Sequence, residues 1–281
     1  MSESSRSSLT PSPGLKNDSL PSSPCAPHTA KRKRSTEGDR KTAPVKLAKR
    51  KKSKKTKPDE DEDLDLKQGL NLAIGRFDSR LEADYVAQRT KRFSSDLSSV
   101  ELEDRHIPET AFRNTSEWKM LRTLQNMPDF LDRYSTRIEG GKSLSTASKK
   151  PGSPHTLVIT SAGLRAADIT RALRTFQTKE AVVAKLFAKH IKLNDAVEYV
   201  KKTRIGIGVG TPSRIIDLLD AGALMSSKLE RVVIDSSHID QKKRGIFDMR
   251  ETQRPLMLLL NRPELKTRYG GSCGNLEVLM Y

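Results

Sequence analysis

The residues best suited to phosphate chemistry are Gly141, Lys142 and Ser143, which match the last three positions of a phosphate-binding loop. In that motif successive backbone N–H groups wrap the phosphates, and a buried strand feeds the loop. The position of the motif's first glycine is occupied by Thr136, and the approach over residues 132–137 lacks the apolar run of a buried strand. The sequence therefore predicts a plain loop here, with a degenerate phosphate loop as the alternative.

A second group with chemical potential consists of Asp235, His238 and Asp240. Carboxylates and imidazole are metal ligands, but three potential ligands on one loop, without a second cluster, are thin support for a metal site. Elsewhere neither paired carboxylates nor a Ser, His and Asp order occurs in a context that supports catalysis. We therefore predict a surface loop, with no metal, no cofactor and no catalytic residue.

The elements that position Asp235 alternate regularly between strands and helices. Thr211 is placed to cap a helix that begins at Pro212, where the missing N–H does no harm. Such alternation, with short connections, predicts an α/β fold whose parallel sheet is covered on both faces. Asp235 then follows a strand at the carboxyl edge, where ligands bind in such sheets. The predicted strands are 157–160, 181–187, 205–209, 232–234 and, at one edge, 275–281; the predicted helices are 164–176, 193–200, 212–219 and 256–260.

Apolar residues also recur ahead of the sheet. Trp118, Leu121 and Leu124 have helical spacing and should pack on the sheet domain. We predict one folded domain over residues 81–281, in which a helical extension (81–135) precedes the α/β sheet (155–281). In the first helix of the sheet, the inward-facing residues should be Leu164, Ile169, Leu173 and Phe176.

Three segments of the sheet resemble the first RecA-like domain of DEAD-box RNA helicases. Residues 210–215 resemble the Thr-Pro-Gly-Arg motif that grips the RNA backbone, and residues 156–169 resemble the strand and helix start that carry Pro-Thr-Arg-Glu-Leu-Ala. Residues 229–238 fall where those helicases have a strand that ends in Asp-Glu-Ala-Asp, and of that motif only Asp235 is retained. The resemblance implies a RecA-like, P-loop NTPase-like sheet. Ser236 stands where the water-orienting Glu would be, and we expect a single RecA-like domain.

A closer resemblance is to the Cms family of nucleolar proteins, subunits of the 90S pre-ribosomal complex that contains U3 RNA. The segments that carry it are 161–166, 185–192 and 208–215, and Leu-Phe-Ala-Lys-His in the second is the most specific. The resemblance runs from about residue 81 to the end and is strong over 156–240. It implies ribosome biogenesis, with pre-ribosomal RNA and pre-ribosomal proteins as partners and the nucleolus as location.

In such a sheet the loops at the carboxyl ends of the strands form the expected RNA-facing edge. A helix N-terminus offers amides, a hydroxyl and a guanidinium to a phosphate, although capping alone would also explain Thr211. Gly163 stands where the helicase motif has Arg, and Arg165 is the candidate substitute. The predicted RNA-binding residues are Arg165, Lys189, His190, Lys192, Thr211 and Arg214.

The charge of the chain is concentrated in its first part. The formal net charge is +17 and the pI is near 9.9, which favours a polyanionic partner. About +12 of this charge precedes Asp59, in a stretch with too few apolar residues to offset its ordering entropy. We predict a long disordered basic tail over residues 1–65, which ends in an acidic block (59–63) that docks basic proteins or is a solvated linker. Two clusters typical of nuclear import signals are Lys31, Arg32, Lys33 and Arg34, then Lys49, Arg50, Lys51, Lys52, Lys54 and Lys55.

The cysteine count and the hydropathy exclude other classes. Cys25 and Cys273 cannot form a disulfide framework, which indicates a reducing compartment. No apolar run approaches the roughly 20 residues that span a bilayer, and the N-terminus lacks the apolar core of a signal peptide. We expect a soluble intracellular protein with neither a membrane partner nor a small-molecule substrate.

The leading hypothesis is a non-enzymatic pseudo-helicase: an RNA- and protein-binding subunit of the 90S pre-ribosome, or small-subunit processome, that acts in pre-rRNA processing in the nucleus and nucleolus. One alternative is an ATP-dependent, helicase-like enzyme that uses Lys142 and Asp235. The other is a chromatin- or replication-linked protein in which only the tail meets nucleic acid.

Overall fold

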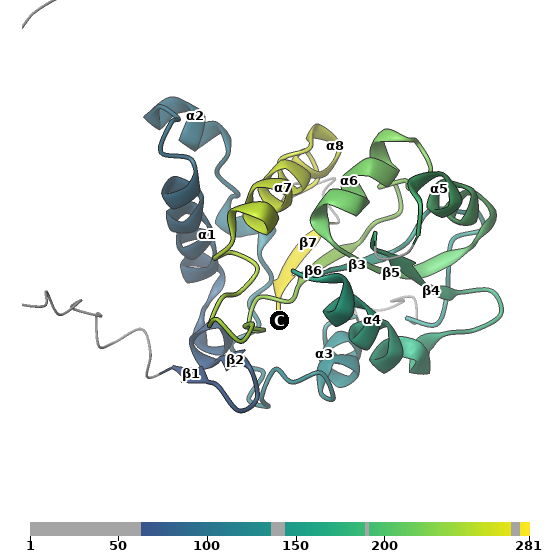
Figure 1. Ribbon diagram of the computed structural model, residues 1–281, viewed down its shortest axis with the longest axis horizontal. Helices are drawn as coiled ribbons and strands as arrows, with labels where there is room; N and C mark the ends of the chain where they lie inside the picture. The colour runs from purple at the N-terminus through teal and green to yellow at the C-terminus, as the bar shows by residue number, and fades with distance from the viewer. Residues whose placement is uncertain (1–62, 136–143, 189–190, 271–275) are drawn as a thin grey trace, which may run out of the picture. The chain divides into compact units, whose positions relative to one another are not determined.

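The computed structural model describes residues 63–135, 144–188, 191–270 and 276–281 (Figure 1). The predicted tail and its two basic clusters lie outside these residues, except for residues 63–65. The candidate phosphate loop, with Lys142 and Ser143, also lies outside them, as do Lys189 and His190.

A five-stranded sheet organises the described chain, with the strand order β4-β5-β3-β6-β7. All neighbouring strands are parallel, so the α/β class predicted from the alternation of strands and helices is confirmed. The strands are β3 (Thr156–Ile159), β4 (Val182–Leu186), β5 (Ile205–Gly210), β6 (Arg231–Ile234) and β7 (Glu277–Met280). Each corresponds to a predicted strand within two residues at either end, because β-branched and aliphatic runs suit a sheet buried on both faces.

Helices cover both faces of this sheet (Figure 1). Side chains alternate between the faces along each strand, so Leu157 and Ile159 join one apolar cluster and Val158 joins the other. The first cluster includes residues of α5 (Leu193–Lys202), α6 (Pro212–Asp220) and α7 (Arg250–Leu260). The second includes residues of α3 (Met127–Arg133) and of α4 (Gly163–Ala172), which continues as a 3₁₀ turn, η4 (Leu173–Phe176). A short helix, α8 (Pro263–Lys266), follows α7.

Strand β5 contains an irregularity that its sequence pattern hides. Ile205 packs in the cluster of α5, α6 and α7, whereas Ile207 and Val209 pack in the opposite one. Strict alternation would place all three on one face. The register with β4 shifts between Val182 and Val183, so β5 has one extra residue there and its later side chains change face.

The residues ahead of the sheet form the predicted helical extension and, in addition, an unpredicted hairpin. The hairpin pairs β1 (Leu64–Asp65) with β2 (Leu70–Asn71). The helices that follow are η2 (Leu72–Arg76), α1 (Ser79–Phe93), α2 (Ser99–Asp104) and η3 (Glu109–Ala111), and α1 packs on α7. Phe112 forms a parallel bridge with Val278, so this extension borders the outer edge of β7.

The prediction of a helix that contains Trp118, Leu121 and Leu124 is wrong. No helix is assigned over residues 112–126, and α3 begins only at Met127. Trp118 still packs on the sheet domain, because its ring meets Phe130 edge-on with the centroids 5.5 Å apart. Leu121 is exposed, so a spacing of three residues occurred here without a helix.

One inward-facing residue of α4 was also predicted wrongly. Ile169 and Leu173 are fully buried and Phe176 is half-buried, as expected, but the Leu164 side chain is 65% exposed. Leu164 is the second residue of α4, so it lies in the first turn and points away from the core. In the described ranges, none of the helices combines the length and the apolar character needed to cross a membrane.

Candidate nucleic-acid interface

The carboxyl ends of four parallel strands place their loops along one edge of the sheet, which we call the carboxyl edge. The residues that follow β3, β4, β5 and β6 lie there in parallel register; Ile159, for example, pairs with both Gly210 and Ile234. Backbone bonds continue past the strands, since Asp235 N donates to Ile159 O and Thr160 N donates to Gly210 O. The sheet thus brings together loops that are up to 75 residues apart in the sequence.

Asp235 is the central polar residue of this edge, and it is held in a buried ion pair. Arg165, from the first turn of α4, donates Nε to Oδ2 at 2.9 Å and Nη2 to Oδ1 at 3.0 Å. The Thr160 hydroxyl donates to Oδ2 at 2.8 Å. The Asp235 side chain is 1% exposed and that of Arg165 13%. Burial opposes the charge of Arg165, but the Asp235 carboxylate outweighs it and raises the pKa of the guanidinium.

This pairing corrects the prediction that Asp235 lies on a surface loop. Asp235 is fully buried rather than part of a surface loop. The second carboxylate weighed as a metal ligand, that of Asp240, accepts from Arg244 Nη2 at 2.7 Å. His238 is half-buried, and burial lowers its pKa. The described residues contain no group of three or more His, Cys, Asp or Glu placed to hold a metal ion.

Ser236 also has a structural partner. Its hydroxyl donates to the Tyr281 carbonyl oxygen at 3.0 Å, and the Ser236 and Ser237 amides donate to the same oxygen. These bonds tie the start of the loop after β6 to the residue that follows β7. A hydroxyl held in this way cannot replace a carboxylate that orients water.

The N-terminus of α6 matches the predicted position, but its side chains are placed differently from the prediction. Thr211 is the N-cap and Pro212 the first helical residue, although the Thr211 hydroxyl makes no capping bond. Arg214 is 7% exposed rather than on the surface. It donates Nη2 to the Ile191 carbonyl at 3.2 Å, while Nε and Nη1 have no hydrogen-bond partner among the described residues. Arg214 therefore braces the loop that follows β4.

Of the three predicted residues in that loop, the structure describes only Lys192. It is the N-cap of α5 and its side chain is exposed. Arg165, by contrast, is engaged by Asp235. The structure therefore keeps Arg165 and Arg214 inside the carboxyl edge and presents Lys192 to solvent.

A further basic group at this edge escaped the sequence reasoning. Lys242, Lys243 and Arg244 are exposed on the loop after β6, in a turn that the Asp240 carboxylate closes by accepting the Lys242 and Arg244 amides. Lys243 has a positive φ of 61°, which this tight turn requires. The signal was present in the sequence, because three consecutive cations occur in the loop that follows the predicted strand 232–234.

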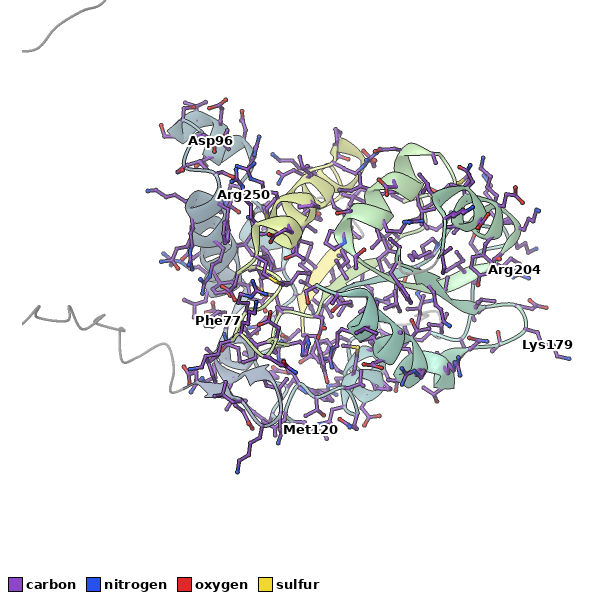
Figure 2. All side chains as sticks on the ribbon, viewed as in Figure 1. Phe77, Asp96, Met120, Lys179, Arg204 and Arg250 are labelled. Atoms are coloured by element: carbon purple, nitrogen blue, oxygen red, sulfur yellow. The ribbon has the colours of Figure 1, made fainter. Side chains whose placement is uncertain are left out.

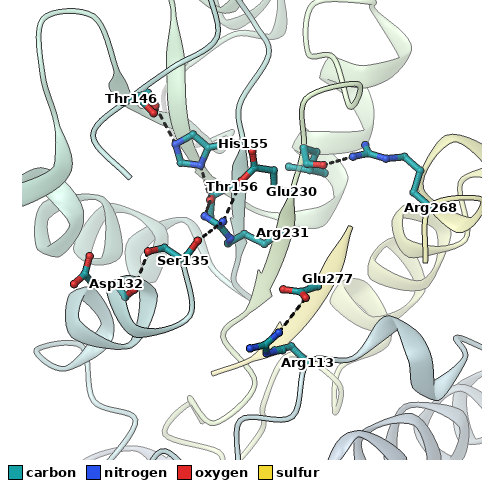
Figure 3. Close-up of polar contacts among 11 residues, drawn as sticks. Arg113, Asp132, Ser135, Thr146, His155, Thr156, Glu230, Arg231, Arg268 and Glu277 are labelled. Carbon is teal, nitrogen blue, oxygen red and sulfur yellow. Dashed lines mark hydrogen bonds and ion pairs between the residues drawn. The ribbon is translucent and has the colours of Figure 1, made fainter. Parts of the chain in front are cut away.

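The opposite, amino edge of the sheet holds the described residues on either side of the candidate phosphate loop (Figure 3). Before that loop, the Ser135 carbonyl accepts Arg231 Nη2 at 3.0 Å, at the start of β6. After it, the Thr146 carbonyl is 3.0 Å from His155 Nε2, just ahead of β3. Asp235 follows the carboxyl end of β6. Both flanks of the segment that contains Lys142 are thus anchored at the edge opposite to Asp235.

Comparisons with known proteins point to one family. A family model described as CMS1, U3-containing 90S pre-ribosomal complex subunit, matches residues 27–281. The chain is 51% identical to Protein CMS1 of Chaetomium thermophilum over 216 residues, which cover 77% of this chain and 85% of that protein. It is 28% identical to Protein cms1 of Schizosaccharomyces pombe (66% and 67% covered) and 32% identical to Protein CMSS1 of Homo sapiens (60% and 57% covered).

Among solved structures, the chain is similar to one chain of a Saccharomyces cerevisiae complex that contains Dbp5, Nup159, Gle1, IP6 and ADP. The TM-score is 0.36 and the identity 13%, with 58% of this chain and 43% of that chain covered.

Proposed function

This chain belongs to the family of U3-containing 90S pre-ribosomal complex subunits, and we propose that it serves the 90S pre-ribosome as a non-enzymatic pseudo-helicase that binds RNA and protein. In this proposal it acts in pre-rRNA processing and small-subunit assembly, in the nucleolus. The two basic clusters of the tail supply nuclear import and electrostatic affinity for RNA.

The observation that carries the non-enzymatic part is the ion pair between Arg165 and Asp235. Nucleotide hydrolysis on this kind of sheet needs an Asp that holds Mg²⁺, a Lys and backbone amides on the phosphates, and a carboxylate that orients water. Here Asp235 has two arginine bonds and a threonine bond, and Ser236 is bonded to Tyr281. A metal ion would have to displace a buried guanidinium, which would leave that charge uncompensated.

The RNA-binding part rests on the cations of the carboxyl edge. Lys192 and the turn that contains Lys242 and Arg244 present exposed cationic side chains, of which Arg244 is paired with Asp240. Lys and Arg at such positions neutralise phosphates and release counterions, whatever the base sequence. Arg214 contributes to this surface indirectly, because its bond to the Ile191 carbonyl holds the loop that leads to Lys192.

Calorimetry with ATP or ADP and Mg²⁺ tests the non-enzymatic part on the full-length chain. We expect no saturable heat, because the candidate metal ligand is occupied by Arg165. Micromolar ATP binding that disappears in Lys142→Ala would contradict the proposal and favour the enzyme that uses Lys142 and Asp235.

An RNA titration at several salt concentrations tests the carboxyl edge. Lys192→Ala should lower the slope of log affinity against log salt by about 0.7, the value for one lost single-strand phosphate contact. Lys202→Ala is the matched control, since Lys202 is exposed at the other end of α5 and pairs with Glu198. If Lys192→Ala and Lys202→Ala change the salt dependence of RNA affinity equally, RNA does not bind at the carboxyl edge.

The same titration on residues 59–281 separates the domain from the tail. We expect weaker RNA binding that is still sensitive to Lys192→Ala. If residues 59–281 have no RNA affinity at moderate salt, only the tail meets nucleic acid and the domain binds protein. That result would favour the chromatin- or replication-linked alternative.

A further inference from the structure

Strand β4 forms an edge of the sheet, and none of the described strands lies beside its outward backbone groups. The Val182 amide donates to the Arg204 carbonyl and the Leu186 carbonyl accepts from the Thr211 amide, so the even-numbered residues face β5. Backbone groups of consecutive strand residues point to opposite sides. The N–H and C=O groups of Val183 and Lys185 therefore point away from the sheet.

In the part of the chain that the structure describes, a groove lies beside this edge. A cavity of about 510 Å³ runs beside β4, between α4 with η4 on one side and α5 on the other. Figure 1 shows these helices on either side of the strand. The residues that shape the groove are Thr170, Arg174, Val183, Lys185, Ala196 and Tyr199. Native proteins usually protect such edges, because an open one pairs readily with another chain.

The groove combines positive charge with apolar surface. Arg174 and Lys185 are exposed, and neither forms an ion pair with a residue that the structure describes. The residues that line the cavity include no Asp or Glu. Tyr199, whose side chain is 43% exposed, adds an aromatic surface on the α5 side. An occupant should therefore carry acidic side chains for the two cations and apolar side chains for Tyr199.

We propose that the β4 edge is a docking site for an extended, alternating acidic and apolar segment of a partner protein, which adds a sixth strand to the sheet beside β4. The outward groups of Val183 and Lys185 supply two donors and two acceptors at the two-residue repeat of a strand, and main-chain bonds of this kind provide the affinity of strand addition. Phosphates carry no matching amide donors, so this repeat favours a protein segment over RNA. The site is separate from the carboxyl edge and does not depend on its RNA binding.

Amide hydrogen exchange of the full-length protein tests this docking site directly. The probe is an acetylated and amidated Glu-Val-Asp-Val-Glu-Val peptide, and its counterpart has Lys at the three acidic positions. In the free protein the Val183 and Lys185 amides should exchange faster than those of Ala184 and Leu186, which face β5. The acidic peptide should slow exchange at Val183 and Lys185 by at least about tenfold, and the basic peptide should not.

Three variants separate backbone pairing from charge. Lys185→Glu should lower the affinity for the acidic peptide by about tenfold, because an attraction between opposite charges becomes a repulsion. Lys179→Glu makes the same change of charge on the exposed loop before β4, outside the groove, and should have little effect (Figure 2). Lys185→Pro removes one outward N–H and leaves the bonds to β5, so it should abolish binding while Ala184 and Leu186 stay protected.

The proposal is overturned if Val183 and Lys185 stay unprotected with the acidic peptide, or if Lys185→Glu and Lys179→Glu behave alike. It is also overturned if a single-stranded RNA oligomer protects these amides and the peptide does not. Protection that rises with protein concentration alone would instead assign the edge to a second copy of this chain.

Discussion

Arg165→Ala should lower the free energy of unfolding by about 3–5 kcal/mol, the usual cost of removing one partner of a buried ion pair. Asp235 would keep its negative charge in a site that is 1% exposed, with only the Thr160 hydroxyl to compensate it. Urea denaturation of the wild type and the variant at neutral pH measures the difference.

An exposed ion pair provides the matched control. Arg171 lies on the same helix and pairs with Asp168 at 2.7 Å, but their side chains are 65% and 39% exposed. Arg171→Ala should therefore cost no more than about 1 kcal/mol. If Arg165→Ala and Arg171→Ala lower the free energy of unfolding by similar amounts, Asp235 is not held in a buried ion pair with Arg165.

A double variant distinguishes a lost charge pair from lost packing. Arg165→Met combined with Asp235→Leu removes both charges and keeps apolar volume, so it should recover most of the stability lost in Arg165→Ala. Recovery would show that the loss in Arg165→Ala comes from the uncompensated charge of Asp235, because the double variant leaves neither charge of the ion pair buried at the end of β6.

The sequence was sufficient for the sheet because its signals are local. Runs such as Val232 to Ile234 identify a buried strand by themselves, and Thr211 followed by Pro212 identifies a helix start. The edge position of one strand was predicted as well, since the strand expected over 275–281 is β7, which lies at one end of the strand order. Local chemistry is thus enough to predict the class and most element boundaries.

Failures arose where three-dimensional neighbours decide the outcome. Arg165 and Asp235 are 70 residues apart, and only the adjacency of β3 and β6 brings them together. Sequence alternation does not fix the strand order, so the sequence left Arg165 free to face RNA. Arg214 shows the same limit: its position at the third residue of α6 was readable, but the Ile191 carbonyl that accepts from it was not. The RNA contacts at the carboxyl edge stay a proposal.

The second large effect concerns Glu82, a buried carboxyl group in α1. Its side chain is fully buried, and neither carboxylate oxygen has a hydrogen-bond partner among the described residues. Burial raises its pKa to about 8, although the positive charge of Arg122 opposes this; Asp78 raises it slightly further. Arg122 itself donates to the carbonyls of Met280 and Thr115, so it does not bond Glu82 directly.

A raised carboxyl pKa makes the folded protein less stable as the pH rises. Between its ordinary pKa of 4.5 and about 8, Glu82 is protonated in the folded chain and ionised in the unfolded one. The folded state therefore binds one more proton, and its free energy of unfolding falls by about 1.4 kcal/mol per pH unit across that window. The whole loss should reach roughly 5 kcal/mol above pH 8.

Glu82→Gln keeps the shape of the neutral carboxyl group and removes its titration. The variant should match the wild type within about 1 kcal/mol at pH 5 and exceed it by roughly 5 kcal/mol at pH 9, as measured by urea denaturation at both pH values. Glu103→Gln makes the same change on the exposed face of α2 and should leave the pH dependence as it is. A constant difference between Glu82→Gln and the wild type would mean that Glu82 is ionised in the folded protein. In that case Arg122, rather than burial, would control its charge.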